Sequence, residues 1–234
     1  MLGRDCAQQV VASGARIVVG HFNSAGAALA LPVYAHAGLP CLLPLATAPG
    51  LLQLAPGLVL RECPTDEDQA SSLLAALAGQ AVAVIHDDSP YGCGLADQFV
   101  TLGATSIAFA QAAEWRGAVV VCAVHIAAAV LARELRGAGC TAQLAFVDDC
   151  EVPEFRELAG SASDGALVAR FPGSARACVD TLVQALATAV GAAPEARGAA
   201  LLEQVRAASR SCYDGDGERQ GAAWEVVPVD MARP

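Results

Sequence analysis

The stretch AVAVIHDDSPYGCGLA (residues 81–96) decides the fold of this chain. Its apolar run 81–85 is rich in β-branched residues and is typical of a strand buried on both faces. Ser, Pro and Gly mark the following segment 87–94 as a loop, and a helical apolar pattern begins at Leu95. A buried strand, a polar loop and a helix in this order form the repeating unit of a parallel α/β sheet.

The same order of strand, loop and helix recurs on both sides of this segment. Further strands are expected at 16–20, 39–44, 58–63, 105–110, 118–124, 143–147, 165–169 and 222–229. Helices are expected at 5–15, 27–37, 69–79, 126–137, 175–191 and 194–210, besides the one that starts at Leu95. One set of strands ends and another begins near Gly79–Gln80, so the spacing predicts two α/β lobes of modest size.

Composition excludes several classes of protein. The chain has 234 residues, 55% of them hydrophobic and 16% charged, which is too apolar for a disordered protein. Its formal net charge is −10 and it has no cluster of cations, so nucleic-acid binding is not expected. The longest apolar run, 118–132, is shorter than the roughly 20 residues that span a bilayer, so membrane insertion is not expected either.

Motifs for catalysis, cofactors and metals are missing from the sequence. The nine cysteines are scattered without a C-x-x-C pair, which fits buried structural thiols in a reducing compartment. There is no G-x-S-x-G, no H-E-x-x-H, and no phosphate-binding loop, which would require a lysine that the chain lacks. The acidic turn 214–218 is too short for a calcium loop. We therefore predict no enzyme, no cofactor and no metal site.

Ligands of open parallel sheets bind beyond the carboxyl ends of the strands. Five loops occupy such positions, and the polar residues in them are ambiguous. Ser24 could hold an anion or cap a helix, and Thr47 lies in the next loop. Tyr91 could cover a ligand or pack on its own lobe, and His125 could be a ligand residue or a core histidine. His86 could be a base, although a strand-end histidine bonded to the backbone is the simpler interpretation.

Four segments together resemble the type I periplasmic-binding family. They are IVVGHFNSA (17–25), GLPCLLPLATAP (38–49), AVIHDDSPYGCGLA (83–96) and YDGDGERQGAAWEVVPV (213–229). The similarity is to the leucine/isoleucine/valine-binding branch, the substrate-binding subunits of branched-chain amino-acid ABC transporters. The third segment is the most specific, because it joins a strand ending in IHD to Tyr-Gly-x-Gly.

The resemblance implies two Rossmann-like lobes with parallel sheets. The first lobe would comprise 1–79 and about 175–205, and the second 80–174 and about 206–234. The family's first strand and first helix have no counterpart in the sequence, so the first strand is expected to be missing. A sheet without it would have an unpaired edge.

The resemblance also implies a set of ligand-binding residues. In the first lobe, Ser24, Ala46 and Thr47 would hold the carboxylate of an amino acid. In the second lobe, Tyr91 would cover the ligand, and Asp149 would face its ammonium group. His125 falls near a further ligand-binding position of the family.

The expected function is non-enzymatic binding of a branched-chain or other small amino acid, or a related amide or carboxylate. ABC transporter membrane subunits would be the protein partner, and the compartment would be the periplasm. A cytoplasmic ligand sensor on the same fold is the alternative if the chain as given is the full gene product, since no signal peptide is seen. A degenerate paralogue that binds nothing is a further alternative, and a doubly wound enzyme comes last.

Overall fold

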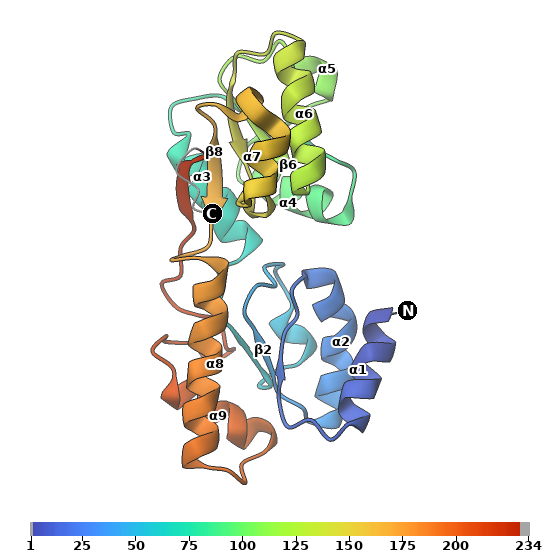
Figure 1. Ribbon diagram of the computed structural model, residues 1–234, viewed down its shortest axis with the longest axis vertical. Helices are drawn as coiled ribbons and strands as arrows, with labels where there is room; N and C mark the ends of the chain where they lie inside the picture. The colour runs from blue at the N-terminus through green and yellow to red at the C-terminus, as the bar shows by residue number, and fades with distance from the viewer. Residues whose placement is uncertain (1, 230–234) are drawn as a thin grey trace. The chain divides into compact units, whose positions relative to one another are not determined.

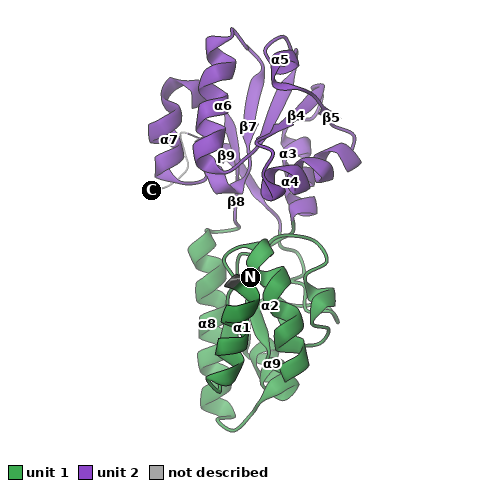
Figure 2. Ribbon diagram, turned by 90° about the vertical axis from the view of Figure 1, so that its right-hand side faces the viewer, with its two compact units in different colours: residues 1–65, 172–222 green, residues 66–171, 223–234 purple. Residues whose placement is uncertain are grey.

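Two sheets organise the chain into two compact units. In the computed structural model, which describes residues 2–229, unit 1 comprises 1–65 and 172–222 and unit 2 comprises 66–171 and 223–234 (Figure 2). The chain therefore passes from one unit to the other three times. We describe each unit by itself.

Unit 1 contains a three-stranded parallel sheet in the order β1-β2-β3. Its strands are β1 (Val18–Val19), β2 (Cys41–Leu43) and β3 (Val59–Arg61). Its helices are α1 (Leu2–Ala12), α2 (Ser24–Ala37), the 3-10 turn η1 (Leu52–Leu54), α8 (Ala175–Ala192) and α9 (Gly198–Ala208).

The side chains of β2 point alternately to the two faces of this sheet, and a different pair of helices covers each face. Cys41 and Leu43 are buried in the cluster that includes α1 and α2, whereas Leu42 between them is buried in the cluster of α8 and α9. Figure 1 shows β2 with these two pairs of helices on opposite sides. Since both faces are covered, the strand is apolar at every position, as expected for a parallel sheet.

Unit 2 contains a six-stranded sheet in the order β5-β4-β6-β7-β8-β9. All neighbours are parallel except β8 and β9. The strands are β4 (Val82–His86), β5 (Thr105–Ser106), β6 (Ala118–Cys122), β7 (Gln143–Phe146), β8 (Leu167–Arg170) and β9 (Glu225–Pro228). The helices are α3 (Asp66–Ala76), α4 (Pro90–Thr101), α5 (Phe109–Ala112), α6 (His125–Gly137), η2 (Asp148–Cys150), α7 (Pro153–Ala159) and η3 (Gly160–Ser163).

The expected α/β class with parallel sheets is confirmed. The strand expected at the start of the stretch 81–96 is present as β4. The helix expected from Leu95 instead begins at Pro90, so most of the segment 87–94 that was expected to be a loop is the first turn of α4. Ser89 caps that helix by accepting a hydrogen bond from the Gly92 amide, and Pro90 occupies its first turn, where a missing N–H costs nothing. These two residues explain why the loop after β4 is short.

The boundaries between the units differ from those expected at 79/80, 174/175 and 205/206. They lie at 65/66, 171/172 and 222/223, because α3 packs against α4 and contacts β8 and β9. The segment after α9 stays in unit 1 because it pairs with the end of β3: the Arg61 amide donates a hydrogen bond to the Gly217 carbonyl at 2.9 Å, and Arg61 and Glu218 form a parallel bridge.

Local details of unit 2 differ as well. The strand expected over 105–110 is only two residues long, since a turn of helix, α5, begins at Phe109. The acidic segment 148–154 contains η2 and the start of α7. Among the described residues, no helix combines the length and the hydropathy that crossing a membrane requires.

Candidate ligand-binding loops

Two loops meet at the carboxyl edge of the unit 1 sheet. One follows β1 and leads into α2, and the other follows β2. The Ser24 hydroxyl accepts a hydrogen bond from the Ala48 amide at 3.0 Å, which joins the two loops. Asn23, not Ser24, caps the helix by accepting from the Gly26 amide at 2.7 Å. Ser24 is therefore free of the capping role and faces the loop that contains Thr47.

The first turn of α2 contributes backbone donors to the same place. The amides of Ser24 and Ala25 belong to the helix's first turn, where a helix offers no carbonyl partners of its own. Together with the positive end of the helix dipole, such amides favour a carboxylate. The Ser24 and Ala25 amides lie beside the loop that contains Thr47, because the Ser24 hydroxyl accepts a hydrogen bond from that loop.

Arg61 at the end of β3 holds the Thr47 loop in place. Its guanidinium donates to the carbonyls of Ala46 at 3.3 Å and Ala48 at 2.7 Å. Its Nε donates to the Glu218 carboxylate at 2.7 Å, and the side chain is 1% exposed. Thr47 thus lies between two anchored carbonyls and is itself 5% exposed. The sequence signal for Arg61 is a charged residue that directly follows the apolar residues 58–60 within the strand expected at 58–63.

Asp87 joins two loops at the carboxyl edge of the unit 2 sheet. One carboxylate oxygen accepts from the Ser89 amide at 3.1 Å and from its hydroxyl at 2.5 Å. The other accepts from the Val124 amide, after β6, at 3.1 Å. Gly92 lies against this arrangement so closely that a Cβ there would meet Asp87 and the Cys122 carbonyl. The Tyr-Gly pair of the sequence motif is therefore part of a tightly packed turn.

Tyr91 is bonded within its own unit. Its hydroxyl donates to the Asp148 carboxylate at 2.7 Å, and the Gln69 side-chain amide donates to the same oxygen at 2.8 Å. Burial raises the pKa of the Tyr91 hydroxyl, and the Asp148 charge adds to the effect. Burial also raises the pKa of the Asp148 carboxyl, against these two hydrogen bonds. The Tyr91 hydroxyl is therefore held by a partner from its own unit.

His125 and Asp149 contact each other. One Asp149 oxygen accepts from the His125 amide at 2.7 Å and lies 2.8 Å from its Nδ1. On the other side of the ring, Nε2 lies 3.3 Å from the Glu154 carboxylate. His125 is the first residue of α6, so Asp149 acts as the acceptor for the start of that helix. The histidine is partly exposed between two carboxylates and is not a core residue.

The predicted site residues therefore form two groups. Ser24, Ala46 and Thr47 lie together at the carboxyl edge of the unit 1 sheet. Tyr91, His125 and Asp149 follow β4, β6 and β7 in unit 2, and each has a partner from its own unit. Arg61, Asp87 and Asp148, which support these residues, were not among the predicted ligand-binding residues.

Comparison with known proteins finds relatives over part of the chain. No protein-family model matches it. The Leu/Ile/Val-binding protein homolog 1 of Brucella abortus is 36% identical over 105 residues, which cover 41% of this chain and 27% of that protein. The Leu/Ile/Val/Thr-binding protein of Salmonella typhimurium is 38% identical over 94 residues, covering 38% of this chain and 26% of that protein. The match thus spans about a quarter of the length of these curated relatives.

Solved structures match over nearly the whole chain. The leucine binding protein LivK of Thermotoga maritima has a TM-score of 0.82 at 18% identity, covering 97% of this chain and 84% of that one. A substrate-binding protein of an ABC transporter from Desulfitobacterium hafniense, in complex with Leu, has a TM-score of 0.76 at 21% identity, covering 96% and 81%. At this level of identity the likeness establishes the fold. The resemblance noted in the sequence is confirmed: the chain is similar to Leu/Ile/Val-binding proteins and has the fold of type I periplasmic binding proteins.

Proposed function

We propose that this chain binds a branched-chain or other small aliphatic amino acid without chemical conversion. The proposal is supported by its similarity to proteins named for binding leucine, isoleucine and valine, and by the fold of structures that include one in complex with Leu. In this proposal it serves as the substrate-binding component of an ABC transporter in the periplasm, delivering the amino acid to the transporter's membrane subunits.

The observation that carries the proposal is the pair of loops around Ser24 and Thr47. A carboxylate placed there would meet the Ser24 and Thr47 hydroxyls and the amides of the first turn of α2. The Arg61 guanidinium is already occupied by the carbonyls of the loop and by Glu218. The loop is thus fixed before the ligand arrives, so binding does not have to order it.

The second group of residues would complete the ligand's surroundings when the two units close on it. Closure of two lobes is favoured when the ligand makes contacts with both of them. Asp149 would face the ammonium group, with His125 beside it as a hydrogen-bonding neighbour. Tyr91 would contribute its ring rather than its hydroxyl, because the hydroxyl is held by Asp148.

Thermal unfolding of the purified chain with leucine, isoleucine and valine tests this proposal. A ligand that binds only the folded protein, present at 100 times its Kd, stabilises it by about 2.7 kcal/mol. We expect a rise in Tm that Thr47→Ala or Ser24→Ala abolishes. Thr188→Ala, on the exposed side of α8, is the matched control and should leave the rise unchanged.

Two results would contradict the proposal. One is a cooperative unfolding transition whose Tm no amino acid raises. The other is a rise in Tm that Thr47→Ala and Ser24→Ala leave as large as Thr188→Ala does, because binding would then occur away from these loops.

A further inference from the structure

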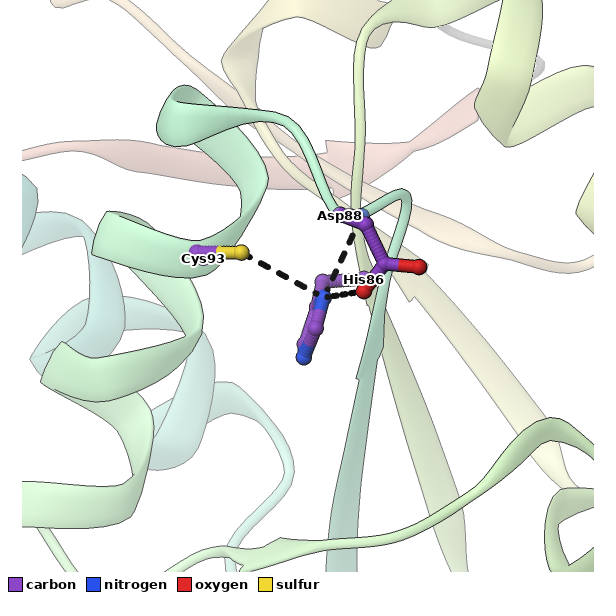
Figure 3. Close-up of side chains that lie close together, drawn as sticks. All are labelled: His86, Asp88 and Cys93. Carbon is purple, nitrogen blue, oxygen red and sulfur yellow. Dashed lines mark hydrogen bonds and ion pairs between the residues drawn. The ribbon is translucent and has the colours of Figure 1, made fainter.

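A histidine, an aspartate and a cysteine lie together where β4 meets α4. His86 is the last residue of β4, Asp88 lies in the loop, and Cys93 is in the first turn of α4 (Figure 3). Their ligand atoms all lie within 4.8 Å of one another. In the sequence they are separated by one and by four residues, which matches no familiar metal motif, and the turn of the chain brings them together.

His86 Nδ1 is the atom about which the cluster is arranged. It lies 3.2 Å from the Asp88 Oδ1 and 3.7 Å from the Cys93 Sγ. The Asp88 amide also donates to it at 3.3 Å. The imidazole nitrogen, the carboxylate oxygen and the thiol sulfur therefore face a common space.

The two separations from His86 Nδ1 are close to the edges of a tetrahedral metal site. Zinc binds nitrogen and oxygen ligands at about 2.0–2.2 Å and sulfur at about 2.3 Å, so the tetrahedral edges are about 3.4 Å for N to O and about 3.6 Å for N to S. The two distances from His86 Nδ1 differ from these edges by about 0.2 Å or less. The Asp88 carboxylate and the Cys93 Sγ lie within 4.8 Å of each other, and rotation of these two side chains would bring them to the O-to-S edge of about 3.6 Å.

The backbone around the cluster is held without a metal. Asp88 has a φ of 59°, in the left-handed region that aspartate tolerates better than most residues. The Asp87 bonds to Ser89 and Val124 and the cap from Ser89 to Gly92 maintain this turn. Strained backbone of this kind is frequent at functional sites. Here it brings the Asp88 carboxylate beside the imidazole.

We propose that His86, Asp88 and Cys93 bind a divalent transition metal, with zinc as the best fit. A thiolate and an imidazole favour Zn²⁺ over Mg²⁺ and Ca²⁺, which prefer oxygen ligands. Three protein ligands leave a fourth position for water or another small ligand. The Asp88 side chain is 92% exposed, so this position is open to solvent.

Binding involves one proton and one exchanged hydrogen bond. The Cys93 thiol gives up its proton to solvent and binds as a thiolate, while His86 binds as the neutral imidazole. The metal takes the Nδ1 lone pair that now accepts from the Asp88 amide, and this exposed amide bonds to water instead. The affinity should therefore increase with pH.

Titration of the freshly reduced full-length chain with Co²⁺ and Zn²⁺ tests the site. We expect one Co²⁺ per chain, a thiolate-to-cobalt charge-transfer band in the near ultraviolet, and loss of that band when Zn²⁺ displaces Co²⁺. Cys93→Ser should abolish the band, and both Cys93→Ser and His86→Gln should weaken Zn²⁺ binding by at least about 10–100-fold. Cys212→Ser and His36→Gln, at exposed positions in unit 1, are the matched controls and should bind as the unaltered chain does.

A second measurement does not depend on variants. Zn²⁺ should slow alkylation of Cys93 in the unaltered chain while exposed Cys6 and Cys212 react as fast as before. A charge-transfer band that persists in Cys93→Ser, or Zn²⁺ protection of Cys212 in place of Cys93, would overturn the proposal. So would the absence of any Co²⁺ band from the unaltered, folded chain.

Discussion

Gly92 occupies a position in α4 where no side chain fits. A Cβ there would lie 2.3 Å from the Asp87 Oδ1 and 2.5 Å from the Cys122 carbonyl oxygen, so the backbone would have to move. We expect Gly92→Ala to lower the free energy of unfolding by about 1–3 kcal/mol. Gly94, two residues on, has no neighbour within 4 Å of its would-be Cβ. Gly94→Ala should raise stability by up to about 1 kcal/mol through helix propensity.

Urea denaturation of the two variants measures this difference. Both substitutions add the same methyl group to the same helix, so opposite signs isolate the close approach at Gly92. Equal effects of the two substitutions would show that the turn between β4 and α4 is looser than described.

Glu151 makes the stability of unit 2 depend on pH. Burial raises the pKa of its carboxyl to about 7, although the Arg170 guanidinium, at 3.8 Å, opposes the shift. The folded state therefore holds a proton that the unfolded state releases near the ordinary glutamate pKa of about 4.3. Between these two values stability falls as the pH rises, because the folded state binds more protons than the unfolded state.

Glu151→Gln is accordingly expected to stabilise the chain at pH 8 by about 1–2 kcal/mol and to have little effect at pH 5. Thermal unfolding at the two pH values measures this, with Glu157→Gln, on the exposed side of α7, as the control. A gain of the same size at both pH values would mean that the carboxyl does not titrate between them.

At the scale of elements, Arg61 connects three segments of unit 1. It joins β3 to the loop after β2 and to Glu218 in the segment after α9. Arg61→Leu would leave two carbonyls and a carboxylate without this partner, which we expect to cost about 2–5 kcal/mol. The same variant should weaken amino-acid binding, since the Thr47 loop would lose its anchor.

The exposed ion pair between Arg176 and Asp180 in α8 provides the control for the Arg61 variant. Arg176→Leu removes a solvent-screened ion pair and should change stability by less than about 0.5 kcal/mol. Urea denaturation of both variants measures the two losses in free energy of unfolding. If Arg61→Leu costs no more than Arg176→Leu does, Arg61 does not anchor the loop.

The strand β4 was expected from the β-branched run at 81–85. The start of α4 was expected at Leu95 but lies at Pro90, because Ser89 and Pro90 cap and begin the helix and do not belong to a longer loop. The assignment of α3 to a unit was not predictable from local signals, because the elements it packs against, α4, β8 and β9, come later in the chain.

The candidate site, too, was predictable from the sequence only in part. Ser24 and Thr47 could be brought together from sequence because the carboxyl ends of neighbouring parallel strands share an edge. The bond from Tyr91 to Asp148 joins residues 57 positions apart, and no periodicity points to it. The His86 cluster was missed because its spacing depends on the left-handed turn at Asp88.

At the scale of the molecule, the nine thiols fall into three classes. Cys6 and Cys212 are exposed, Cys93 is intermediate, and the remaining six are buried. Burial raises the pKa of Cys41 to about 12 and of Cys178 to about 11. A higher pKa leaves less of the reactive thiolate, so these two cysteines react more slowly still.

We therefore expect a thiol reagent to modify Cys6 and Cys212 rapidly in the folded chain and Cys93 more slowly. The other six should react only after denaturation, which peptide mass spectrometry can establish site by site. Rapid modification of a buried cysteine such as Cys122 would show that unit 2 opens under native conditions. A change in Tm on adding a reductant would show that a disulfide contributes to stability, which would contradict this pattern of reactivity.

The threefold passage of the chain between the units has a consequence for its synthesis. The five parallel strands of unit 2 come from one uninterrupted stretch, 66–171, whereas unit 1 needs 172–222 as well. A nascent chain released from the ribosome at residue 171 would display Leu42 and Leu60 without the α8 and α9 residues that cover them. Unit 1 is thus begun before unit 2 but can be completed only after all five parallel strands of unit 2 have been translated. During that interval its uncovered sheet face is the surface that a chaperone would meet.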